Sequence, residues 1–285
     1  MIKKWFFSSV VFSFLVLPSI HSEVLAPQAP LPQDIQENQE DAYYGQNPYD
    51  DLAKDTRSLD LKFDRFEVKD NMIQVLDVSA TVDDKPAAKQ TFTTRIFFYR
   101  PSLATQKVEF GPEFSGFPLV ITGRQQATDG VLGFPARLLL DNPMSQTQIE
   151  HMIPIMNEQR SPPPENVKVD VQNWETDEQG RIVQGSIVYE EDSKDLPNIS
   201  KFRWIANISQ SEVTFKLGLQ GNFDVLFQDN EKPLIDLLTE LKDKNPKTVG
   251  EAAVIINKHV EKEINAEKAQ QQNTDQEVPS DLLNF

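Results

Sequence analysis

The sequence predicts an α+β protein of two β-rich modules, each a long hairpin plus further antiparallel strands, each followed by helix. Two stretches, 59–82 and 167–188, alternate apolar and polar residues on both sides of a polar turn, which is typical of a β-hairpin. After each set of strands, apolar residues recur at helical spacing. We expect disordered N- and C-terminal arms to flank the two modules.

The first 22 residues have the pattern of a signal peptide. Lys3 and Lys4 precede an apolar run that Pro18 ends. The run, Trp5 to Leu17, is shorter than the ~20 apolar residues of a membrane-spanning helix. We therefore expect cleavage after Ser22 and export, to the periplasm or to the extracellular medium, with no transmembrane segment in the mature chain.

The charge of the mature chain argues against several partners. Loss of Lys3 and Lys4 reduces Lys+Arg from 28 to 26 against 44 Asp+Glu, a formal charge of −18. This excess of acid repels the phosphates of nucleic acids and anionic membrane surfaces. The chain has no cysteine, so an ordinary apolar core must stabilise it without disulfides.

Residues 23–56 form an acidic leader and 57–160 the first module. The leader is rich in Pro, Gln and Asn and has too little aliphatic content to bury, so we expect disorder. The module begins with the 59–82 hairpin, turning at 69–71 and slipping in phase before Phe66, which suggests bulges. Further strands are expected over 91–100, 118–122 and 135–140. A helix should begin at Ser145, carry Ile149, Met152, Ile153 and Met156 on one face, and kink or end at Pro154.

The Pro-rich segment 161–165 is predicted to be a linker, and 166–265 the second module. After the 167–188 hairpin, strands are expected over 202–208, 213–219 and 223–227. Two helices close the module. Leu234, Leu237, Leu238 and Leu241 mark the first, and Thr248 with Glu251 forms a capping box for the second. The modules are either a duplication or two unlike halves of one domain. Residues 266–285 are expected to be a disordered tail with an apolar tip.

Catalytic chemistry is scarce in this sequence. The mature chain keeps two histidines, His151 and His259, and carries no phosphate-binding, zinc-protease or nucleophile-elbow motif. Residues 175–182 partly match a calcium-binding EF-hand loop, but Ser186 stands where the loop needs a bidentate Glu, so we favour a hairpin turn. We predict a non-enzyme without a metal or cofactor.

One basic region stands out in this acidic chain. Between Lys85 and Leu140 there are seven basic residues and three acids. The same region holds Gly-Phe-Pro twice, at 116–118 and 133–135, where each most simply starts a strand after a bend. The candidate ligand or partner face consists of Arg95, Arg100, Phe117, Arg124, Phe134 and Arg137. The alternative is that these cations neutralise the acidic second half of the chain.

Three functions follow, in order of preference. The first is a non-catalytic envelope protein that acts as a protein-binding or assembly scaffold, with a docking tail formed by Leu282, Leu283 and Phe285. The second is a carrier of a lipid or another apolar ligand in a groove lined by phenylalanines: Phe92, Phe97, Phe98, Phe110, Phe114 and Phe117. The third is a hydrolase that uses paired carboxylates.

Overall fold

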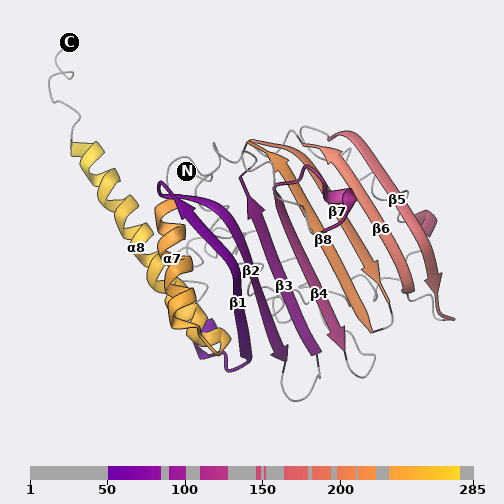
Figure 1. Ribbon diagram of the computed structural model, residues 1–285, viewed down its shortest axis with the longest axis horizontal. Coiled ribbons are helices and arrows are strands. Elements are labelled where there is room, and N and C mark those ends of the chain that lie inside the picture. Colours follow the sequence, from indigo (N-terminus) through magenta and orange to yellow (C-terminus); the bar gives the residue numbers. More distant parts are fainter. Residues whose placement is uncertain are drawn as a thin grey trace, which may run out of the picture.

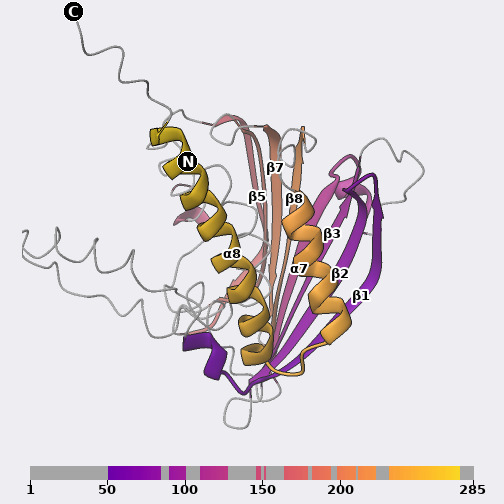
Figure 2. The ribbon, with the colours of Figure 1, turned by 90° about the vertical axis from the view of Figure 1, so that its left-hand side faces the viewer.

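The computed structural model describes residues 51–84, 90–100, 110–127, 146–148, 151, 164–178, 182–193, 198–209, 211–222 and 231–276. Within these residues, one eight-stranded antiparallel sheet carries two helices on one of its faces (Figures 1 and 2). The elements are η2 (Asp51–Lys54), β1 (Ser58–Lys69), β2 (Met72–Asp84), β3 (Gln90–Tyr99), η3 (Pro112–Phe114), β4 (Leu119–Ala127), β5 (Glu165–Thr176), β6 (Ile182–Asp192), β7 (Ile199–Ile208), β8 (Glu212–Gly221), α7 (Glu231–Lys244) and α8 (Val249–Gln276).

The strand order is β1-β2-β3-β4-β8-β7-β6-β5, so two four-stranded meanders meet at their last strands. We call β1–β4 the first half and β5–β8 the second half of the sheet. They join through β4 and β8, where Leu119 lies opposite Leu219 and Gln126 opposite Glu212. The strands that the sequence assigns to two modules therefore share a single sheet, and the described residues are mainly β.

Both predicted hairpins are confirmed. The first turns at Asp70 and Asn71, whose φ angles of 53° and 58° suit the tight turn that matches strand twist. Its bulges fall between Phe63 and Arg65 and between Glu67 and Val68, near the predicted phase slip. In the second hairpin, β5 ends at Thr176 and β6 begins at Ile182, so strands rather than EF-hand helices flank the calcium-like segment.

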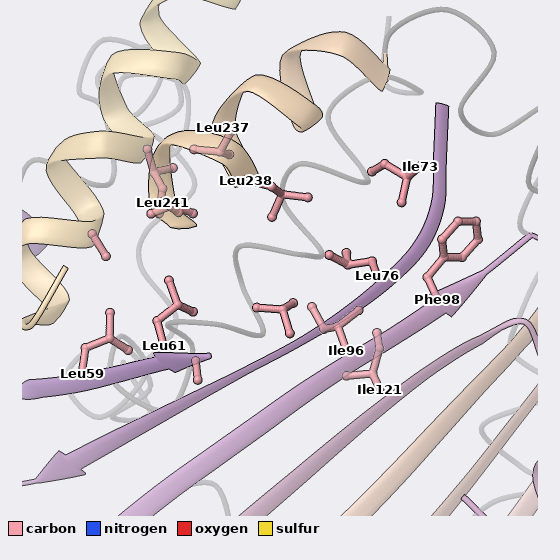
Figure 3. Packing of buried hydrophobic residues seen from close by; sticks show 14 of the residues in the cluster. Leu59, Leu61, Ile73, Leu76, Ile96, Phe98, Ile121, Leu237, Leu238 and Leu241 are labelled. Carbon is pink, nitrogen blue, oxygen red and sulfur yellow. The ribbon is translucent and has the colours of Figure 1, made fainter. Parts of the chain in front are cut away.

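The main core lies between the first half of the sheet and the two helices. Alternate side chains of β2, β3 and β4, such as Val78, Ile96 and Ile121, are at most 1% exposed on this helix face. Leu237, Leu238 and Leu241 of α7 pack on them at the predicted spacing (Figure 3). Their burial sets α7 against β1 and β2, at one end of the sheet (Figure 1).

The opposite face of the sheet, which we call the open face, carries a second and smaller core. Phe110 and Phe114 belong to a segment, residues 110–118, that folds over one end of this face. With Phe117 they pack on Phe97 of β3 and Val120 of β4. Away from this cover, β3, β4 and β8 carry polar side chains on the open face, among them Thr93, Arg124 and Thr214, as expected for an antiparallel sheet with one face against a core.

The start of α8 forms the predicted capping box. The Glu251 N–H donates to Thr248 Oγ1 at 3.1 Å, and a Glu251 carboxylate oxygen accepts from the Lys247 N–H at 2.7 Å. Two boundaries differ from the prediction. α8 continues to Gln276, so 266–276 are helical where a disordered tail was expected. At the other end, η2 and Asp55 contact α8, where the Gly250 N–H donates to the Asp55 carbonyl at 2.8 Å.

Several predictions concern residues outside those described. They are the signal peptide, most of the leader, the strands at 135–140 and 223–227, and the apolar tip of the tail. Of the helix predicted from Ser145, only 146–148 and 151 are described, and these are helical. Across the described residues, none of the helices has the length and apolar content needed to cross a membrane.

Candidate binding surface

Three of the six predicted face residues lie together on the open face. Arg95 of β3 and Arg124 of β4 project from neighbouring strands, with Arg95 opposite Thr122 and Arg124 opposite Thr93. Phe117 belongs to the aromatic cluster on the same face. Arg100 follows β3 and lies on the helix face instead. Phe134 and Arg137 are outside the described residues.

Each of the two open-face arginines is held by a carboxylate on an adjacent strand. The Arg95 guanidinium donates to both Asp77 carboxylate oxygens, at 2.7 Å and 2.6 Å, and lies 5.1 Å from the Phe110 ring centroid. Arg124 contacts Glu212 of β8 at 2.5 Å across the junction of the two halves. The side chains of Arg124 and Glu212 are 52% and 31% exposed, so this pair remains open to a partner.

Phe117 lies in the first Gly-Phe-Pro, which leads into β4 as predicted. Gly116 has a φ of 87°, a left-handed conformation that favours glycine. The Phe117 ring then packs edge-on against Phe114, 5.8 Å between centroids. Both rings lie over Gly218 of β8, where an added Cβ would come within 2.7 Å of Phe114. The bend and this glycine together let the segment 110–118 sit directly on the sheet.

Two cations of the second half complete the surface, and the sequence analysis missed both. Arg203 of β7 pairs with Glu190, donates to the Glu113 carbonyl, and lies 5.7 Å from the Phe117 ring centroid. Lys216 of β8 donates to the Phe110 carbonyl at 3.3 Å and to Glu113 Oε1 at 3.4 Å. They therefore tie a segment of the first half to strands of the second half.

Glu190 is the most heavily paired carboxylate on this face. Burial alone would raise its pKa, but Arg203, Lys168 and Lys201 outweigh burial and lower the pKa below its ordinary value. Glu190 is thus held ionised at neutral pH. A general acid needs a raised pKa, so Glu190 does not fit the proton donor of a carboxylate hydrolase.

Arg100 is buried between the sheet and α7 and does not lie on a surface. We call its pair with Glu231, together with the bond from Ile73 to Glu231, the Arg100–Glu231 clamp. The Arg100 guanidinium pairs with Glu231, the first residue of α7, and both side chains are 6% exposed. The other Glu231 oxygen accepts from the Ile73 N–H at 2.5 Å. Arg100 and Arg124 thus both pair with acids of the second half of the chain, as the neutralisation hypothesis predicts, whereas Arg95 pairs within the first half.

A groove of about 460 Å³, lined by polar and charged residues, runs between α7 and α8. Its central residue is Glu240, which accepts from Lys244, from His259 Nε2 at 2.8 Å and from Lys258 at 3.1 Å. These contacts lower the pKa of Glu240 to about 2. His259 of α8 is therefore linked to α7 through Glu240.

The phenylalanines of the carrier hypothesis do not share a groove. Phe97, Phe110, Phe114 and Phe117 pack together on the open face, whereas Phe98 belongs to the core on the helix face. The apolar void seen between the helices and β1–β2 has a volume of about 20 Å³, which is too small for an acyl chain.

Comparisons of the chain with protein-family models, with curated proteins and with solved structures find no match. The fold and surface define a class in general terms: an antiparallel sheet with one helix-covered face and one polar, ion-paired face.

Proposed function

We propose that this protein is a non-catalytic, exported envelope protein that binds another protein through the open face of its sheet. The observation that carries the proposal is the arrangement of Arg95, Arg124, Arg203 and Lys216. These side chains come from four adjacent strands, and each is already oriented by an acceptor on the same face.

Such an arrangement suits a protein partner better than a small anion. An anion would have to displace the carboxylates that Arg95 and Arg124 already hold. A protein surface can instead add its own hydrogen bonds at the exposed side of each pair. Arginines held in place lose little side-chain entropy on binding, and arginine is enriched at the centres of protein interfaces.

Capture from envelope extract tests this function. We expect the double variant R124Q/E212Q to retain at most a tenth of wild-type capture of a partner identified by mass spectrometry, because it removes both charges from the exposed pair. The matched control is K232Q/D236Q, which removes a similarly exposed pair on α7. Equal capture by R124Q/E212Q, or an equal loss in the control, would exclude the open face.

The tail is a second part of the proposal. Leu282, Leu283 and Phe285 would dock on the partner, so deletion of 281–285 should weaken capture and leave the melting temperature unchanged. Full capture by the truncated protein would remove the tail from the proposal without affecting the open face.

Export rests on the N-terminal pattern of Lys3, Lys4, the apolar run and Pro18. N-terminal sequencing of protein purified from the periplasm should find Glu23 as the first residue. Recovery of the intact N-terminus in the cytoplasm would contradict it.

A further inference from the structure

We infer that two copies of this chain associate through β5, the end strand of the second half, in antiparallel pairing about a two-fold axis at Val169. The two eight-stranded sheets then form one continuous sheet. This inference does not rest on the proposed function, which concerns a different protein on the open face.

The two end strands of the sheet, β1 and β5, differ in what pairs with their outer edges. The beginning of β1 is joined to the α7–α8 connection, where the Leu59 N–H donates to the Lys247 carbonyl at 2.8 Å and Ser58 pairs with Thr248. Within the described residues, β5 pairs with β6 alone. An end strand with a regular central stretch is a template for another strand.

The centre of β5 is regular. Its register irregularities lie between Glu165 and Lys168 and from Gln172 to Thr176, which leaves 168–172 in unbroken pairing with β6. One of its carbonyls already accepts from beyond β6: Gln146 Nε2 donates to the Val171 carbonyl at 3.1 Å. A second copy would replace the Gln146 side-chain donor at Val171 with a backbone N–H group.

The sequence of this stretch selects the partner and the register. Residues 167–171 read Val-Lys-Val-Asp-Val, with the two charges equally spaced about Val169. In antiparallel pairing centred on Val169, Lys168 lies opposite Asp170 of the second copy, twice across the axis. Pairing centred on Lys168 or Asp170 would instead place like charges opposite each other, which is destabilising.

Exposure and packing agree with this register. The Lys168 side chain is 75% exposed, and its contact with Glu190 is long, at 3.3 Å. The ammonium group can therefore turn toward a second copy. On the helix face, Val169 is half-buried and packs in a small cluster with Val171, Ile187 and Trp204. Val169 of a second copy would extend this cluster and bury apolar surface that one copy leaves in contact with water.

Analytical ultracentrifugation of the purified mature chain tests the inference with no other protein present. Wild-type protein should show a concentration-dependent dimer. D170K should weaken the dimer at least tenfold, because the introduced lysine then faces Lys168 of the second copy. The exchange K168D/D170K should restore it, since opposite charges again lie opposite.

A matched exchange on the other end strand is the control. D60K/K62D swaps a similarly spaced pair on β1, where Lys62 and Asp60 lie 2.8 Å apart, and should leave the dimer unchanged. A wild-type chain that is monomeric at all concentrations would overturn the inference. So would a D170K dimer of wild-type strength, or a K168D/D170K variant that melts like wild type and stays monomeric. None of these outcomes bears on capture of a different protein by the open face.

Discussion

The two halves of the sheet are both four-stranded antiparallel meanders, but they are covered differently. In the first half, β2 and β3 carry side chains such as Ile73 and Ile96 that are 1% exposed beneath α7. In the second half, Phe202 and Leu217 reach the edge of this core and remain half-buried. Figure 2 shows α7 and α8 together on one side of the sheet, and within the sheet α7 lies mainly against β1 and β2.

This difference suggests a division of work between the halves. The first half, with its helices, supplies most of the apolar burial that stabilises the fold. The second half supplies Arg203 and Lys216 to the open face and Lys168 and Asp170 to the end strand. Substitutions of buried residues in the first half should therefore reduce stability most, whereas substitutions of exposed residues in the second half should mainly affect binding.

The largest effect is expected from Arg100→Met. It leaves the Glu231 carboxylate buried with the Ile73 N–H but without its counter-charge. Breaking a buried pair in this way costs about 3–5 kcal/mol. The free energy of unfolding in urea measures it. Arg124→Met, which breaks an exposed pair at the junction of the halves, should cost no more than about 1 kcal/mol. Equal losses of stability in Arg100→Met and Arg124→Met would show that the buried Arg100–Glu231 pair contributes no more than the exposed pair.

A leucine pair compares the halves directly. Leu238→Ala, in α7 over the first half, removes a side chain that is 1% exposed and should cost roughly 2–5 kcal/mol. Leu217→Ala, on β8, should cost less than about 2 kcal/mol, because the Leu217 side chain is half-buried and part of it already contacts water. Urea unfolding of both variants decides the matter. A reversed order would place the main core in the second half.

Local elements were predictable because local patterns encode them. Alternation placed both hairpins, and the spacing of Leu237, Leu238 and Leu241 placed α7. The joining of β4 to β8 was not predictable, since Leu119 and Leu219 meet across a long stretch of chain and no local pattern records that pairing. The end of α8 was also missed. Beyond Ile264 the sequence is polar, so no apolar stripe signals the helix.

The candidate surface was predictable in part for similar reasons. The local excess of basic residues identified Arg95 and Arg124. Arg100 was assigned to the same face, although a residue five positions from Arg95 falls on the opposite side of an extended strand. Arg203 and Lys216 lie outside the basic region and join it only through the sheet order. Counting charge along the sequence cannot find residues that the fold brings together.

A smaller effect is expected where α8 begins beside β1. Thr248→Ala removes the oxygen that accepts the Glu251 N–H and should cost about 1 kcal/mol. Thr248→Ser keeps a hydroxyl there and should retain most of the stability. Urea unfolding measures both, and hydrogen exchange should show faster opening of β1 in Thr248→Ala, while β5 is unchanged. A serine variant as unstable as the alanine variant would mean that Thr248 acts through its methyl group instead.

The smallest effect concerns the groove between α7 and α8. Lys244, His259 and Lys258 lower the pKa of Glu240 from 4.5 to about 2, so the carboxylate is stabilised in its ionised form in the folded protein. A lowered pKa contributes stability that is fully present above the unfolded value of 4.5. That contribution is lost as the pH falls from about 4.5 toward about 2.

Glu240→Gln isolates this contribution from the other carboxylates that titrate in the same range. The difference in urea midpoint between wild type and Glu240→Gln should shrink as the pH falls from about 5 toward about 2.5. At the upper end of that range, added salt should also reduce the difference, because the groove is open to solvent. Hydrogen exchange should place the acid-induced loosening in α7 and α8, over the first half, and leave β5–β8 unaffected. A difference that does not vary with pH would show that Glu240 holds the helices by hydrogen bonds that glutamine can replace. Protonation of Glu240 would then not explain any greater acid sensitivity of the helices over the first half.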